Sequence, residues 1–80
     1  DITAYRSWSH ILGEEFKQLQ HCAAHHKPSL FSYYGATNPA EFFAVISESF
    51  FERPAEFYQQ HQQLYQELSQ FYQLNPIHWQ

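Results

Sequence analysis

Acidic side chains recur on one face of residues 38–52, where side chains capable of chemistry are most concentrated. Glu41, Glu48 and Glu52 are spaced so that, in an α-helix, all three lie on nearly the same side. Carboxylates on a largely apolar helix pair with cations, bind metals or take up a proton, because a buried unpaired charge is costly. The local pattern favours capping and solvent exposure, and it leaves open that one carboxylate is a metal ligand or a catalytic group.

The aromatic segment just before these acids contains a second candidate, Tyr34. Its ring either packs under the connecting loop with its hydroxyl on a backbone group, or presents that hydroxyl to developing oxyanion charge. Local sequence leaves both interpretations open. Gly35 is expected to permit a backbone turn that a Cβ atom would hinder.

The acids and the tyrosine need a helix to position them, and its start signals are clear. Asn38 is suited to cap a helix and Pro39 to occupy the first helical position. Glu41 follows Asn38 by three residues, the place of a capping-box acid. We expect a helix over about residues 39–52 that is buried within a domain, because apolar side chains cover most of its circumference. Those apolar residues are Phe42, Phe43, Val45, Ile46, Phe50 and Phe51.

Apolar residues also recur at three- and four-residue spacings over residues 3–25 and 54–73, so we expect an amphipathic helix in each. His61 lies on the apolar stripe of the last helix and is interpreted as a histidine at the edge of the core. Eighty residues allow one domain with one small core. We therefore predict an all-α fold, a small three-helix bundle forming a single domain over residues 1–80.

Composition excludes several classes of protein. The formal net charge of −4 argues against binding to nucleic acid, which requires a basic face. No apolar run is long enough to span a bilayer, so no membrane partner is expected. A single cysteine permits no disulfide framework and is compatible with the cytoplasm, where we expect the protein. Aromatic residues make up 20% of the chain, an excess that predicts a surface contacting a partner domain.

Two histidines offer an alternative metal site. His21 and His25 share a helical face and, together with Glu41, would supply two imidazoles and one carboxylate. Histidines near a helix C-terminus are also favoured by the helix dipole alone. The dipole-and-surface interpretation is favoured, and the metal alternative stays open.

Residues 34–45 read Tyr-Gly-Ala-Thr-Asn-Pro-Ala-Glu-Phe-Phe-Ala-Val, followed by Ser47-Glu48 and Phe50-Phe51. This stretch resembles the C-terminal motif of the zinc peptidases of the Mlc titration factor A (MtfA) family, which are distantly related to the catalytic domain of anthrax lethal factor. In those proteins two histidines of a His-Glu-x-x-His helix and a glutamate from a later helix hold zinc.

The resemblance implies roles for three residues of this chain. Glu41 would be the third zinc ligand, and Tyr34 would be the catalytic tyrosine that points at the reacting carbonyl oxygen. Glu48 would at most lie next to the zinc ligands, without binding zinc itself.

One departure from the motif matters more than any match, because the 80 residues contain no His-Glu-x-x-His. The nearest sequence is 21–25, in which Cys22 stands where the general-base glutamate would be. We therefore expect the chain to be the C-terminal part of a longer zinc metallopeptidase, and to be inactive alone because one carboxylate cannot hold a catalytic zinc. The resemblance suggests aminopeptidase activity, while the choice between exo- and endopeptidase stays open.

The resemblance also implies partners. The expected ones are the remainder of the catalytic domain and a peptide substrate. The alternative is a non-catalytic interaction module that binds a transcriptional repressor such as Mlc.

Overall fold

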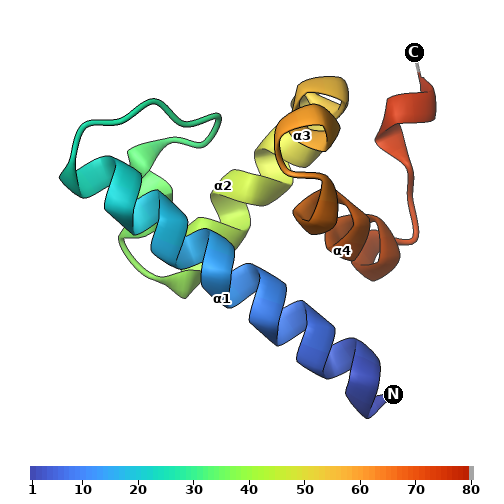
Figure 1. Ribbon diagram of the computed structural model, residues 1–80. Coiled ribbons are helices and arrows are strands. Elements are labelled where there is room, and N and C mark those ends of the chain that lie inside the picture. The colour runs from blue at the N-terminus through green and yellow to red at the C-terminus, as the bar shows by residue number, and fades with distance from the viewer. Residues whose placement is uncertain (80) are drawn as a thin grey trace.

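The computed structural model describes residues 1–79, which form helices and connecting turns with no strand among them (Figure 1). This confirms the predicted all-α fold. The four α-helices and two 3₁₀ helices are, in chain order, α1 (Ile2–Ala24), η1 (Tyr33–Ala36), α2 (Pro39–Glu52), α3 (Pro54–Gln60), α4 (Gln62–Tyr72) and η2 (Pro76–Trp79).

The first two α-helices begin at capping residues. The Asp1 carboxylate accepts a hydrogen bond from the Thr3 amide at 3.2 Å, at the start of α1. Asn38 caps α2, whose first residue is Pro39 and whose last is Glu52, so α2 has the bounds predicted for it. Each cap satisfies a backbone donor that would otherwise lack a partner in the first helical turn.

The predicted third helix over residues 54–73 is instead two helices, so the structure has four α-helices where three were expected. The break falls at His61, whose backbone has φ −138° and ψ 61°, outside the helical region. The flanking glutamines are good helix formers, so local propensity gives no reason for a break. The His61 side chain contacts other parts of the chain, described below, and these tertiary contacts outweigh the local preference.

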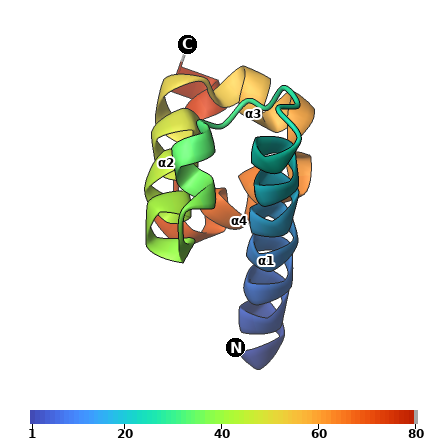
Figure 2. The ribbon, with the colours of Figure 1, turned by 90° about the vertical axis from the view of Figure 1, so that its left-hand side faces the viewer.

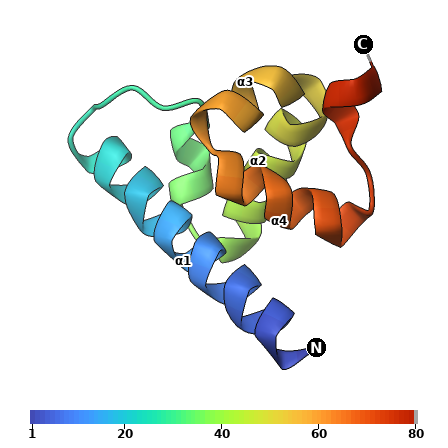
Figure 3. The ribbon, with the colours of Figure 1, turned by 45° about the vertical axis from the view of Figure 1, so that its right-hand side comes forward.

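The core lies where α2, α3 and α4 meet the C-terminal half of α1. The short helix η1 packs against both α1 and α2, and in Figure 2 it stands beside α2 with α1 across from it. The helices α3 and α4 complete the enclosure (Figure 3). The buried core residues are Leu19, Phe31, Phe42, Ile46, Phe50, Phe57, Leu64, Tyr65 and Leu68.

The N-terminal half of α1 projects beyond the other helices (Figures 1 and 3). Trp8 joins it to the bundle by stacking on Phe71 of α4, with ring centroids 5.0 Å apart. Several large apolar side chains stay exposed, as the aromatic composition predicts; they include Ile2, Tyr5, Tyr34, Phe51 and Phe71. No helix within residues 1–79 combines the length and the apolar character that crossing a bilayer requires.

Candidate functional site

The helix η1 places Tyr34 at the surface by means of short local hydrogen bonds. The Ser32 hydroxyl caps η1 by accepting from the Tyr34 amide at 3.2 Å. At the other end, the Tyr34 carbonyl accepts from both the amide and the hydroxyl of Thr37, at 3.1 and 2.7 Å. The backbone of Tyr34 is therefore fixed on both sides, while its side chain remains 62% exposed.

Gly35 is the residue that allows η1 to approach the two helices beside it. A Cβ atom built on Gly35 would lie 3.1 Å from a side-chain carbon of Leu19 in α1 and 3.1 Å from one of Val45 in α2. Among the described residues no glycine has a positive φ. The expectation that a Cβ atom would hinder the turn at Gly35 therefore holds, and the hindrance comes from lack of space.

The start of α2 places Glu41 in its first turn. The Asn38 side chain accepts from the Glu41 amide at 2.9 Å, the cap predicted from the sequence. The reciprocal half of a capping box, from the Asn38 amide to the Glu41 carboxylate, is absent from the hydrogen bonds of residues 1–79. The half-buried Glu41 carboxylate is thus left free to act on its other neighbours.

The Glu41 carboxylate acts on the phenol of Tyr34. Hydrogen bonding to Glu41, then the negative charge of Glu41, and then desolvation raise the pKa of Tyr34 above its ordinary value. A nearby carboxylate has this effect because it disfavours the phenolate and accepts a hydrogen bond from the neutral phenol. The two residues singled out from the sequence therefore lie on elements that pack against each other, Tyr34 on η1 and Glu41 on α2.

The chemistry available to this pair is limited but definite. A carboxylate oxygen is a suitable zinc ligand and a neutral phenol is a hydrogen-bond donor. A catalytic zinc needs three protein ligands. No group of three or more His, Cys, Asp or Glu side chains in the described chain is arranged to hold a metal ion. The site as it stands offers one ligand and one donor.

The other candidates from the sequence lie apart from this pair. Glu48 is exposed and lies two turns further along α2, on the same outward side as Glu41. His21 and His25 are exposed near the end of α1, with ring centroids 4.4 Å apart. Within residues 1–79 these two histidines and Glu41 do not form a metal-binding group, so the alternative metal site is unsupported.

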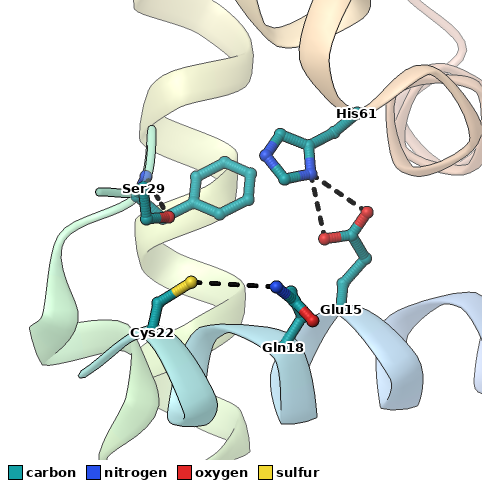
Figure 4. Close-up of polar contacts among 6 residues, drawn as sticks. Glu15, Gln18, Cys22, Ser29 and His61 are labelled. Atoms are coloured by element: carbon teal, nitrogen blue, oxygen red, sulfur yellow. Dashed lines mark hydrogen bonds and ion pairs between the residues drawn. The ribbon is translucent and has the colours of Figure 1, made fainter. Parts of the chain in front are cut away.

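Sequence reasoning missed a polar contact between distant helices. Nδ1 of His61 lies 3.0 and 3.1 Å from the two carboxylate oxygens of Glu15 in α1 (Figure 4). His61 was interpreted correctly as a residue at the edge of the core, since its side chain is 18% exposed. Its partner is 46 residues away in the sequence, and no local pattern connects the two.

Comparison with known proteins assigns the family. Residues 1–73 match the model of the glucose-regulated metallo-peptidase M90 family, and the chain belongs to that family. It is a metallopeptidase family, and the Glu41 carboxylate is of a type that can bind a metal ion. The resemblance to MtfA proteins is therefore supported over nearly the whole chain.

A curated relative shows how much of such a protein this chain represents. The chain is 44% identical over 52 residues to an uncharacterized protein of Synechocystis sp.. The matched segment covers 65% of this chain and 19% of that protein, so the chain spans about a fifth of the relative's length. No solved structure gives a significant match.

Proposed function

We propose that the chain forms the C-terminal part of a zinc-dependent peptidase, in which Glu41 is the third zinc ligand and Tyr34 is a catalytic donor. The observation that carries this proposal is the packing of η1 against α2, together with the Glu41 carboxylate raising the pKa of the Tyr34 phenol. The membership of a metallopeptidase family supports it. Glu48, on the same side of α2, would lie next to the ligands without binding zinc itself.

The donor set of this chain fits zinc as one part of a shared site. Glu41 contributes an oxygen ligand, and two histidines of a His-Glu-x-x-His helix in another part of the polypeptide would contribute the rest. When bound, zinc lowers the pKa of a coordinated water and polarises the substrate carbonyl. Because this chain provides too few zinc ligands, we propose that it is inactive alone. We also propose that the protein works in the cytoplasm, with which its single cysteine is compatible.

Tyr34 has a defined task in this proposal. A tyrosine phenol is protonated at neutral pH, and the Glu41 carboxylate raises the pKa of Tyr34 further, so the hydroxyl is available to donate one hydrogen bond. A donor aimed at the carbonyl oxygen stabilises the negative charge that develops there during peptide hydrolysis. This is the role of the corresponding tyrosine in the catalytic domain of anthrax lethal factor, to which we propose a distant relationship.

The test is the zinc content of the full-length protein. Glu41→Gln keeps the size of the side chain but removes a charged ligand, so we expect most of the bound zinc to be lost on dialysis. Glu48→Gln is the matched control on the same helix face and should retain zinc. Retention of zinc by Glu41→Gln would exclude Glu41 as a ligand.

Activity tests the second residue. Tyr34→Phe should retain zinc but lower kcat by about 10²–10³, the loss typical of removing one oxyanion donor. Assays on peptides with free and blocked N-termini would show whether the activity is that of an aminopeptidase. An unchanged kcat would assign Tyr34 a structural role only.

A second candidate function is a non-catalytic module that binds a transcriptional repressor such as Mlc. The observation in its favour is the exposure of large apolar side chains on the projecting half of α1 and on α4, where Tyr5, Trp8 and Phe71 line one surface hollow. Such patches mark contact surfaces in monomeric proteins. A full-length protein lacking His-Glu-x-x-His, but binding the repressor, would favour this function over the peptidase.

A further inference from the structure

Glu15 and His61 make the only contact within residues 1–79 between a carboxylate and a basic side chain at ion-pair distance. It joins the middle of α1 to the junction between α3 and α4, and Figure 4 shows the carboxylate and the ring facing each other across that gap. The two side chains are 20% and 18% exposed, so the pair is sheltered from bulk water. A sheltered contact to a charged group holds its partners more firmly than a surface pair does.

The geometry also fixes the orientation of the imidazole ring. An ionised carboxylate only accepts hydrogen bonds, and both of its oxygens lie within 3.1 Å of Nδ1 of His61. Nδ1 must therefore carry a proton in either charge state of the ring. Glu15 selects one ring orientation, just as a carboxylate orients the histidine behind a metal or a nucleophile.

The oriented ring packs against Phe31. The centroids of the two rings are 4.6 Å apart, and Phe31 is only 3% exposed. The residue next to Phe31 is Ser32, whose hydroxyl caps η1 by accepting from the Tyr34 amide. A series of contacts thus runs from Glu15 through His61 and Phe31 to the segment that carries Tyr34.

Phe31 also touches the helix that carries the carboxylate. Its ring makes an edge contact with the ring of Phe42, at a centroid separation of 6.4 Å, and Phe42 directly follows Glu41. A second anchor holds the same segment, because the guanidinium of Arg53 donates to the Leu30 carbonyl at 3.0 Å. One buried ring therefore links the α3–α4 junction to both members of the candidate site.

We propose that Glu15 and His61 are positioning residues, which hold Phe31 in place and thereby set the position of Tyr34 relative to Glu41. The proposal concerns the geometry of the site, and only its activity readout rests on the proposed peptidase function. Neither residue contacts a reacting atom, so their effect acts entirely through Phe31 and η1.

The first test is amide hydrogen exchange in the full-length protein. The Gly35 amide, which donates to the Ser32 carbonyl at 3.0 Å, reports the order of η1. Glu15→Ala should speed its exchange about tenfold, the effect expected from losing a hydrogen bond to a charged group. Glu15→Gln retains an oxygen that accepts from Nδ1, so it should restore most of the protection.

Two controls separate positioning from general loss of stability. Glu14→Ala changes the neighbouring exposed acid and should leave exchange at Gly35 as in the unaltered protein. The Ile46 amide, in the buried middle of α2, should keep its protection in Glu15→Ala. Unchanged exchange at Gly35, or equal acceleration at Gly35 and Ile46, would overturn the proposal.

The second test is kinetic and uses the zinc-loaded protein. Glu15→Ala should lower kcat about tenfold with KM and zinc content unchanged, and it should have no further effect in a Tyr34→Phe background. Additive effects of the two substitutions would overturn the positioning role. If Tyr34→Phe alone leaves kcat unchanged, the proposed function of Tyr34 fails, while the exchange result at Gly35 still decides the positioning role.

Discussion

The start of α2 and the junction between α3 and α4 are built in contrasting ways. At the start of α2, the cap lies within four residues of the groups that it serves, since Asn38 accepts from Glu41. At the α3–α4 junction, His61 leaves the helical conformation within a run of good helix formers and pairs with a residue of α1. The first region follows from local chemistry and the second from contacts that exist only in the folded chain.

The contrast teaches where each region should be vulnerable. A locally encoded element should weaken mainly when its own capping and packing residues change. A junction held by distant contacts should respond to substitutions in other elements. Phe31 touches both regions, since its ring contacts Phe42 of α2 and also Phe57 and His61 at the α3–α4 junction.

The largest expected effect comes from removing this shared ring. Phe31→Ala should destabilise the fold by about 3–5 kcal/mol, because it leaves a cavity where two aromatic clusters meet. Urea unfolding monitored by circular dichroism measures the loss. Phe51→Ala, which truncates a ring that is 38% exposed, should cost clearly less. Equal losses would show that Phe31 does not bridge the two regions.

The next effect compares the two glycines of the chain. Gly35→Ala should cost about 1–3 kcal/mol, because the new methyl group would press on Leu19 and Val45 at 3.1 Å. Gly13→Ala in α1 meets nothing within 4 Å and should stabilise the protein by about 0.5–1 kcal/mol. Thermal unfolding of the two variants should therefore shift in opposite directions, and a shared direction would contradict the close packing of η1.

A smaller effect tests the local cap directly. Asn38→Ala should cost about 1 kcal/mol, because the Glu41 amide loses its acceptor. Asn38→Asp keeps an acceptor at the same place and should retain most of that stability. Chemical denaturation of both variants supplies the comparison. A loss as large as that of Phe31→Ala would mean that the start of α2 depends on more than its own cap.

The smallest effect concerns pH. The Tyr34 phenol should ionise above the ordinary pKa of about 10, and Glu41→Gln should lower that pKa by removing both the hydrogen bond and the charge. The folded chain then holds this proton to higher pH than the unfolded chain does, so stability falls as pH rises through that alkaline range. The ring carbon-13 shift of Tyr34 measures the titration, and Glu48→Gln should leave it unchanged.

Much of the fold could be predicted from the sequence because its signals are local. Helical periodicity and the Asn38-Pro39 start signal led to the all-α class and to the bounds of α2. The break at His61 could not be predicted, because it depends on Glu15 and Phe31, which lie 46 and 30 residues away. Propensity within residues 54–73 favours one continuous helix, and only the folded chain supplies the competing contacts.

The candidate site likewise has parts that the sequence indicates and parts that only the folded chain shows. The family motif in the sequence points to Tyr34 and Glu41, and in the structure the Glu41 carboxylate raises the pKa of Tyr34. The sequence indicates that a Cβ atom would hinder the turn at Gly35, but only the structure shows that Leu19 of α1 and Val45 of α2 are the obstacle. The contact between Glu15 and His61 had no signal of its own in the sequence.

Cys22 adds a practical consequence to this arrangement. Its buried sulfur accepts from the Gln18 amide, on the side of α1 that faces His61 and Ser29 (Figure 4). It is the single thiol of the chain, so the rate at which a cysteine reagent labels it measures how often this one site becomes exposed. Each opening of α1 from the neighbouring loop would expose this one sulfur atom to the reagent, with no substitution needed to introduce a reactive group.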